Sequence, residues 1–196
     1  MKKGITGLVA AAALLPAAVA AESLSYNYVE GGLALYPSYE SQTFLGLEGR
    51  GSFAINENIF AFGGLKYLTD DVDLTALHVG GGYRHGLDAK TDLWAGLTIE
   101  YQEIDGGTQC VNTFSGPFCV SNSFDDTALG LRGGLRHQLD DKLEIGGSAR
   151  IITGDLDYVG LTGTARFALR DNLKLLGEAD LYDGELGLIG GVTLEF

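Results

Sequence analysis

The sequence predicts an all-β protein: an up-and-down antiparallel transmembrane β-barrel of about ten strands, with eight strands as the alternative. Three observations support this prediction. The chain begins with an export signal, its apolar and polar residues alternate with a period of two, and short turns alternate with longer loops. The 30 glycines against 3 prolines also suit a sheet that must bend as it closes.

The first twenty residues have the features of a cleaved secretory signal peptide. Two lysines lie near its start, Leu8–Ala20 is almost wholly apolar, and residues 18–20 form a small-x-small cleavage signal. The apolar stretch is shorter than the roughly 20 residues that a membrane-spanning helix needs. We therefore expect residues 1–20 to be removed and residues 21–196 to form one barrel domain.

Period-two alternation runs through most of the remaining chain. Between Leu45 and Ile55, odd positions are apolar or Gly, whereas even positions hold Glu48, Arg50 and Ser52. The same pattern recurs in segments 59–67, 77–83, 93–101, 129–135, 143–151, 159–169, 173–181 and 186–196. The first strand, near 24–36, alternates less regularly, and we expect a bulge near its paired glycines 31–32.

The apolar face distinguishes a membrane barrel from a soluble sandwich, which alternates in the same way. It repeats at nearly constant length, and about ten tilted residues span about 25 Å, the height of the apolar band of outer-membrane barrels. We therefore expect an outward apolar face in contact with lipid and a polar face that lines the lumen.

Charged residues gather on the predicted polar face. Of the 13 Lys and Arg, two lie in the signal peptide, Lys90 and Lys142 lie in turns, and the other nine lie on this face. The charged residues expected to line the lumen are Glu48, Arg50, Arg84, Glu100, Arg132, Arg136, Glu144, Arg150, Arg166, Glu178 and Asp180. Two interpretations stay open: an ion-pair network that plugs the lumen, or a narrow, anion-preferring channel, since cations outnumber carboxylates in this set. Small barrels favour the plug, because open channels are usual nearer sixteen strands.

The connectors indicate the orientation. Short turns at 56–58, 86–91, 140–142 and 171–172 alternate with loops at 37–42, 69–73, 105–124, 154–157 and 183–184. Outer-membrane barrels place their short turns in the periplasm. We therefore expect a Gram-negative outer-membrane protein with both termini in the periplasm.

The loops are acidic, and the longest one contains the chain's two cysteines. A possible Ca²⁺ or Mg²⁺ crown, able to bridge lipopolysaccharide phosphates, comprises Asp70, Asp71, Asp73, Asp125, Asp126, Asp155 and Asp157. The alternative is that these residues only form hydrated turns. In an oxidising compartment we expect a Cys110–Cys119 disulfide. The formal net charge of −13 argues against nucleic acid as a partner.

No set of residues suggests catalysis. Nucleophilic catalysis needs a nucleophile, a base and an orienting group within hydrogen-bond reach. His85 and His137 lie near the short turns, and no partner is evident for His78. We therefore expect that the protein is not an enzyme and binds no cofactor. The alternative is a lipid-modifying enzyme.

Two segments resemble known proteins. Residues 24–32, Leu-Ser-Tyr-Asn-Tyr-Val-Glu-Gly-Gly, resemble the opening of small outer-membrane proteins called diffusible-signal-factor-regulated "faux quorum-sensing" proteins, OmpA-like in style. Residues 191–196 resemble the C-terminal signal, ending in Phe196, that the barrel-assembly machinery reads. The resemblance implies a barrel whose partners are the lipid bilayer, lipopolysaccharide and that machinery. The resemblance does not identify a ligand or a surface partner. We expect a structural or surface-interaction role through the acidic loops.

Overall fold

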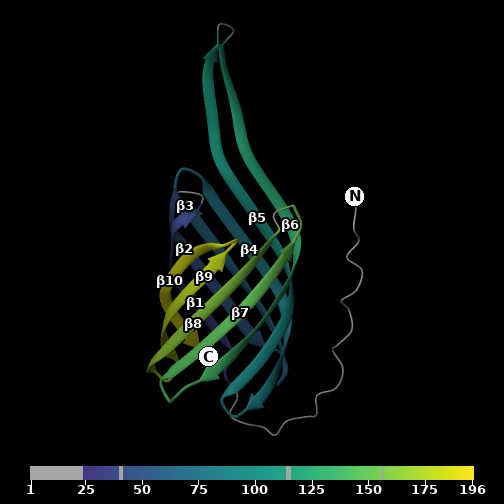
Figure 1. Ribbon diagram of the computed structural model, residues 1–196, viewed down its shortest axis with the longest axis vertical. Helices are drawn as coiled ribbons and strands as arrows, with labels where there is room; N and C mark the ends of the chain where they lie inside the picture. The colour runs from purple at the N-terminus through teal and green to yellow at the C-terminus, as the bar shows by residue number, and fades with distance from the viewer. Residues whose placement is uncertain (1–23, 40–41, 114–115, 156) are drawn as a thin grey trace.

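The computed structural model describes residues 24–39, 42–113, 116–155 and 157–196. Ten strands form one closed antiparallel barrel in which each strand pairs with its sequence neighbours and β1 pairs with β10 (Figure 1). The strands are β1 (Tyr28–Tyr39), β2 (Gln42–Ala54), β3 (Ile59–Thr69), β4 (Asp73–Asp88), β5 (Thr91–Thr113), β6 (Gly116–Gln138), β7 (Leu143–Thr153), β8 (Tyr158–Arg170), β9 (Leu173–Tyr182) and β10 (Glu185–Glu195). The all-β, ten-strand prediction is confirmed, and the eight-strand alternative is wrong.

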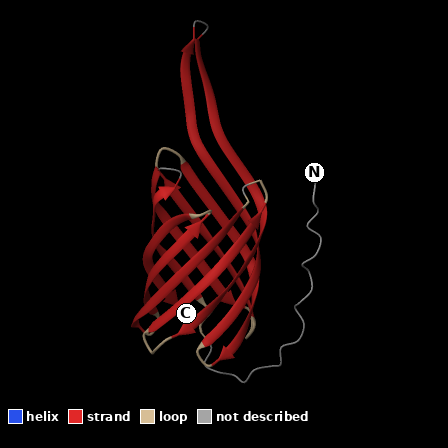
Figure 2. Cartoon of the chain, viewed as in Figure 1, coloured by secondary structure: helices blue, strands red, loops and turns tan. Residues whose placement is uncertain are grey.

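The described residues contain strands, turns and loops only (Figure 2). Among them, no helix is long and apolar enough to cross a membrane. The predicted signal peptide, residues 1–20, lies outside the described residues and stays a prediction.

The barrel closes where the two ends of the described chain meet. The backbone N–H of Phe196 donates to the Asn27 carbonyl at 3.1 Å, so both ends lie at the same rim. This rim carries the short turns, and we call it the turn end; the opposite rim is the loop end. In the short turn before β7, the carboxylate of Asp140 accepts backbone N–H bonds from Lys142 and Leu143, at 2.8 and 3.0 Å. These bonds hold the pKa of Asp140 below its usual value.

The bulge expected at Gly31-Gly32 is wrong. Both glycines pair in unbroken register with β10 and with β2, and the irregularity between β1 and β2 falls between Tyr36 and Tyr39. A Cβ on Gly32 would lie 2.7 Å from the Gly190 carbonyl oxygen. The absence of a side chain at Gly32 therefore allows β1 and β10 to approach closely. In the sequence, a glycine that allows close approach and a glycine in a bulge both weaken the alternation, so the two cannot be distinguished.

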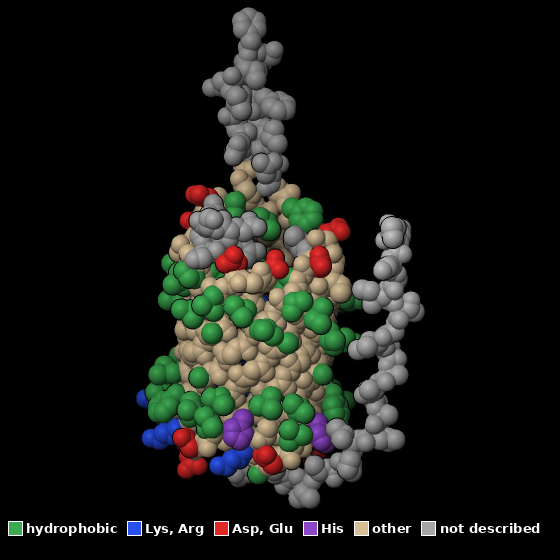
Figure 3. All heavy atoms as spheres, viewed as in Figure 1, with side chains coloured by type: hydrophobic (Ala, Val, Ile, Leu, Met, Phe, Trp, Pro, Cys, Tyr) green, Lys and Arg blue, Asp and Glu red, His purple; other side chains and the backbone are tan. Residues whose placement is uncertain are grey.

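The alternation predicts correctly which side chains face outward. On β5, Leu97 is 70% exposed, whereas its neighbour Thr98 is 2% exposed. On the face shown in Figure 3, hydrophobic side chains lie along the barrel wall and charged groups lie toward the two rims. The outer wall is therefore apolar, and the polar residues that alternate with the wall residues along each strand point inward.

The loop predicted at 105–124 is instead a strand extension. β5 and β6 each have 23 residues and pair as far as Thr113 opposite Gly116, beyond an irregularity between Asp105 and Thr108. Figure 1 shows this hairpin projecting well past the other strands. The register places Cys110 opposite Cys119. Their side chains lie outside the described part, so the disulfide stays a prediction.

Candidate functional site: a filled lumen

A hydrophobic cluster closes the lumen at the loop end. We call it the loop-end cluster; its buried members are Ala34, Tyr36, Phe44, Leu68, Leu74, Ile152, Tyr158, Tyr182 and Ile189. The rings of Tyr158 and Tyr182 pack with their centroids 4.3 Å apart, and Tyr36 is 1% exposed. Such rings bury a large apolar area at the loop end of the lumen.

A second hydrophobic cluster lies at the turn end. This turn-end cluster contains Leu24, Tyr26 and Phe60, with Ala54, Phe62 and Trp94 packed against it. The Tyr26 and Phe60 ring centroids lie 4.6 Å apart, and Phe60 also contacts Phe62 at 5.4 Å. The two clusters leave a polar layer enclosed between them.

The segment before β1 contributes two of the three buried members of the turn-end cluster, Leu24 and Tyr26. Residues 24–27 precede β1 and are not part of a strand. The Nη1 atoms of Arg84 and Arg136 donate to two carbonyl oxygens of this segment, at 2.7 and 2.8 Å. Both guanidinium groups also lie over the ring of Tyr26, at 4.6 and 4.7 Å from its centroid. We call residues 24–27 the N-terminal plug, because they cover the turn end from inside the barrel.

The polar layer is an ion-pair network. Within the described residues, its basic members are Arg50, Lys66, Arg84, Arg132, Arg136, Arg150, Arg166 and Lys174. Its acidic members are Glu30, Glu48, Asp92, Glu100, Glu144, Glu178, Asp180 and Glu195. Eight cations therefore meet eight carboxylates in the described residues, so the network as a whole has no excess of cations.

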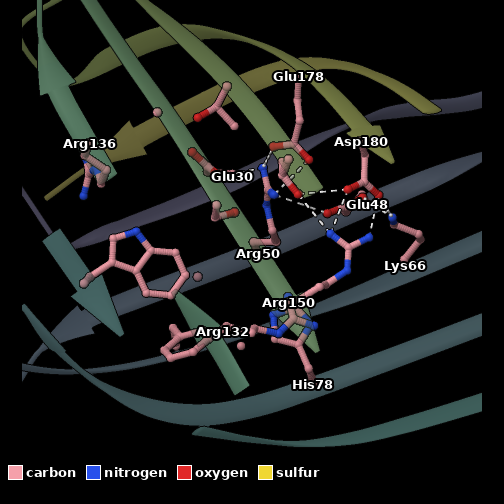
Figure 4. A pocket seen from close by; sticks show the side chains of 18 of the residues that line it. Glu30, Glu48, Arg50, Lys66, His78, Arg132, Arg136, Arg150, Glu178 and Asp180 are labelled. Carbon is pink, nitrogen blue, oxygen red and sulfur yellow. Dashed lines mark hydrogen bonds and ion pairs between the residues drawn. The ribbon is translucent and has the colours of Figure 1, made fainter. Parts of the chain in front are cut away.

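One group of pairs lies beneath the loop-end cluster, around Asp180 (Figure 4). Arg150 donates to both oxygens of this carboxylate, at 2.8 and 3.0 Å. The Tyr36 hydroxyl donates to Asp180 Oδ2 at 2.7 Å, and Lys66 Nζ lies 3.2 Å from the same oxygen. Lys66 also donates to the Tyr36 hydroxyl. The apolar cluster is thus bonded to the charged layer through Tyr36.

Arg50 lies at the centre of a second group. It donates to both carboxylate oxygens of Glu178, at 3.1 and 2.7 Å, and its Nη2 lies 2.9 Å from Glu30. On the other side of the lumen, Arg132 makes a two-bond contact with Glu100, at 2.9 and 2.8 Å. Such paired contacts fix both side chains and offset the cost of burying charge.

Glu144 joins three cations at the turn-end side. Arg136, Arg166 and Lys174 lie 2.8, 3.0 and 3.1 Å from its carboxylate oxygens. Arg166 extends the network to Glu30, which it meets at 2.6 Å. A mobile ion would have to replace these contacts to pass.

Inward-facing glycines provide the space for these side chains. A Cβ on Gly160 would lie 2.4 Å from Arg150 Cζ, and one on Gly187 would lie 2.3 Å from the Tyr36 ring. The outward-facing Gly163 and Gly177 would place a Cβ in open space. The side chains of Arg150 and Tyr36 therefore occupy lumen space that these inward-facing glycines leave open.

A cavity of about 150 Å³ remains inside the polar layer. His78, Arg132 and Glu100 line part of it, together with Phe62 and Trp94. Figure 4 shows His78 close to Arg132. At roughly 10–15 Å³ of such volume for each water, it has room for on the order of ten molecules. Tyr26 lines this cavity and its Oη is buried without a protein partner, so it is a natural contact for water there.

All eleven charged residues predicted to line the lumen take part in the network. Sequence reasoning missed Glu30, because the first strand alternates weakly, and Asp92, because it follows a turn. Both lie at even positions, as do buried residues of β2 beside β1 and of β4 beside β5, such as Ser52 and Arg84, whereas the buried residues of β10 lie at odd positions. The parity shared with β2 and β4 was the available signal. Arg170, expected on the polar face, is exposed after an irregularity between Ala168 and Arg170.

The acidic crown forms no compact cluster. In the described part of the chain, no three His, Cys, Asp or Glu side chains are placed to hold a metal ion. Two carboxylates instead order the rim: Asp126 accepts from the backbone N–H of Asp155 at 2.8 Å, and Asp70 from that of Thr43 at 3.2 Å.

His78 lies in the lumen, and His137 Nδ1 is 2.8 Å from the Thr91 hydroxyl at the turn end.

A closed barrel with an apolar outer wall and a charged, filled interior defines a class of outer-membrane protein. The chain matches the model of the outer membrane protein beta-barrel domain over residues 7–167 and belongs to that family. It is therefore an outer-membrane β-barrel.

Solved barrels share the architecture. A NanC porin is 11% identical with a TM-score of 0.50, covering 86% of this chain and 100% of that one. A KdgM porin is 10% identical with a TM-score of 0.49, covering 86% and 99%. Ail, the attachment invasion locus protein of Yersinia pestis, is 13% identical with a TM-score of 0.45, covering 86% and 95%. At this identity the NanC likeness shows the fold alone, and no curated protein matches the chain.

Proposed function

We propose that this protein is a closed, non-enzymatic outer-membrane barrel that acts at the cell surface through its loop end. The turn end, with both termini, lies in the periplasm, and the loop end faces the exterior, as in other barrels of this class. The partners on the membrane side are the bilayer, lipopolysaccharide and the assembly machinery that reads the C-terminal strand.

The filled lumen is the observation that supports this proposal. An ion crossing the barrel would have to displace Tyr36 and its neighbours at one end and the N-terminal plug at the other. Between them it would have to compete with buried ion pairs, three of them bidentate, whose separation leaves uncompensated charge. A small barrel filled in this way is a stable wall rather than a channel.

The exterior role rests on what the loop end presents. The β5–β6 hairpin projects beyond the rim (Figure 1), and carboxylates lie at that rim on the face shown in Figure 3. A hairpin that extends beyond the rim lies where a surface partner can reach it. Ca²⁺ or Mg²⁺ held between this rim and lipopolysaccharide phosphates is a secondary part of the proposal.

A narrow channel is the second candidate, and the 150 Å³ cavity favours it. The N-terminal plug is not a strand, so its removal would open that cavity to the periplasm without breaking the barrel ladder. With equal numbers of cations and carboxylates in the network, such a channel would have weak ion preference.

Single-channel recording of the refolded mature chain in a planar bilayer tests the proposal. A gel shift between boiled and unboiled samples verifies that the barrel has formed. We expect a shifted band and no conductance steps; discrete steps from the unmodified chain would overturn the closed-barrel proposal. A lipopolysaccharide mass spectrum with and without the protein tests the absence of lipid-modifying activity, and a new lipid species would contradict it. Induction of the transcript by a diffusible signal factor tests the resemblance of the opening segment.

A further inference from the structure

The β5–β6 hairpin leaves sheet edges unpaired outside the barrel. β4 pairs with β5 only as far as Asp73 opposite Asp105, and β7 pairs with β6 only as far as Thr153 opposite Leu129. β5 and β6 continue to pair with each other to Thr113 and Gly116. Beyond the rim, in the described residues, each strand therefore has one neighbour instead of two. Rows of backbone N–H and C=O groups on the free side are the groups that recognise another extended chain.

The two edges differ in how well they are protected. On β5, the register irregularity between Asp105 and Thr108, with Gly107 at a φ of 70°, interrupts the edge. On β6, the register to β5 is continuous from Gly116 to Ser121, and Pro117 lies beside the tip. Bulges, prolines and charges are the usual devices that stop an edge from pairing. Residues 118–124, Phe-Cys-Val-Ser-Asn-Ser-Phe, contain no charge and no proline.

Charge is confined to the base of the hairpin. No Asp, Glu, Lys or Arg occurs between residues 106 and 124, whereas Asp105, Asp125 and Asp126 flank this neutral stretch. A second copy of the chain would bring an identical acidic rim and a formal charge of −13. Like charges oppose that pairing, whereas a basic strand would complement the rim.

We propose that the free edge of β6, residues 118–124, docks an extended basic segment of another polypeptide by β-augmentation. This inference rests on the proposed surface role. Backbone hydrogen bonds along the edge supply the pairing, and the carboxylates at the base favour basic side chains. A Cys110–Cys119 disulfide, directly across the hairpin, would hold the two strands in register and lower the ordering cost of binding.

Three labelled synthetic peptides serve as probes. The first alternates Lys and Val. The second replaces each Val by Pro, which keeps the charge, removes every second backbone N–H donor and disfavours pairing in a sheet. The third alternates Glu and Val. Fluorescence anisotropy measures their binding to the full mature chain in nanodiscs of zwitterionic lipid. We expect binding of the Lys-Val peptide alone. If the Lys-Pro peptide binds equally well, charge alone explains the binding and the proposal is overturned. The proposal is also overturned if the Lys-Val peptide does not bind.

Two matched variants locate the docking edge. Ser121 on β6 and Thr108 on β5 are register partners at the same height, so Ser121→Lys and Thr108→Lys change the net charge equally. We expect Ser121→Lys to weaken Lys-Val binding by about tenfold or more, since it places a like charge on the docking edge. Thr108→Lys should retain binding within about twofold, because the added charge lies on the other edge. Equal losses in both variants would overturn the assignment to β6.

The test separates this inference from the closed-barrel proposal. The heat-shift gel verifies each variant's fold, and amide hydrogen exchange should show added protection at residues 118–124 with the Lys-Val peptide. Unchanged exchange there would overturn the docking site. Peptide binding does not depend on conductance. A barrel that does not conduct and does not bind the peptide would overturn only the docking proposal for β6. A barrel that conducts and binds the peptide would overturn only the closed-barrel proposal.

Discussion

Arg150 on β7 and Asp180 on β9 form a bidentate ion pair across the intervening strand β8, with contacts of 2.8 and 3.0 Å. The pair can cross because β8 carries Gly160 at this position, where any Cβ would lie 2.4 Å from Arg150 Cζ. A glycine on one strand thus permits the interaction of charges on its two neighbours.

Substitution of this glycine tests the packed lumen. Gly160→Ala forces Arg150 to move, and we expect it to lower the free energy of unfolding by about 1–3 kcal/mol. Gly163→Ala, on the same strand but facing outward with nothing within 4 Å, is the control and should change it by less than about 0.5 kcal/mol. Denaturant unfolding in detergent, followed by the gel shift, gives both values. Equal effects would contradict a filled interior.

Removal of Asp180 tests the ion-pair network. Asp180→Ala leaves Arg150 and Lys66 without this buried carboxylate, and we expect a loss of about 3–5 kcal/mol. The exposed rim residue Asp157 provides the control, because Asp157→Ala should stay within about 0.5 kcal/mol. The same unfolding assay applies. A loss below 1 kcal/mol for Asp180→Ala would mean that the network contributes little beyond filling space.

A charge on the outer wall tests the lipid-facing assignment. Leu131 is 53% exposed in mid-strand, and Leu131→Arg should cost about 2–4 kcal/mol near the bilayer midplane. Leu139→Arg, at the turn end, should cost only about 0–1 kcal/mol, because the membrane interface tolerates charge. Unfolding from lipid vesicles measures both. Similar costs at the two depths would show that the wall is not arranged around a bilayer as we describe.

Two closed ends predict a specific conductance pattern. Tyr26→Ala loosens the N-terminal plug and Tyr36→Ala loosens the loop-end cluster, yet each variant keeps one cluster intact. We expect both single variants to remain silent in a planar bilayer and the double variant to produce brief conductance steps. Steps in either single variant would mean that one cluster alone closes the lumen. A silent double variant would place the barrier in the ion-pair layer.

The last residue tests the assembly signal. The Phe196 side chain is 68% exposed, whereas its backbone N–H bonds to Asn27. Phe196→Ala keeps the backbone bond and removes only the side chain, so we expect lower outer-membrane levels with normal export. Fractionation and immunoblotting of periplasm and outer membrane measure this. Unchanged outer-membrane levels would remove Phe196 from the assembly signal.

Much of the fold could be predicted because period-two alternation is a local property of the chain. It correctly located ten strands, and it identified inward-facing side chains such as Glu48 and Arg132 without knowledge of their partners. It failed where local pattern was weak or misleading. Glu30 lies in a strand with poor alternation, and the Gly- and Ser-rich stretch at 105–124 suggested a loop although cross-strand pairing continues through it.

The sequence by itself determined the strands, their inward and outward faces and the short turns, since these depend on neighbouring residues. Only the closed barrel decided what fills the lumen. Closure brings β1 beside β10 and places Arg50 of β2 against Glu178 of β9, 128 residues away in the chain. It also folds residues 24–27 over the turn end, against Arg84 and Arg136. These contacts join distant segments, and the cost of leaving charges unpaired in a closed interior selects them.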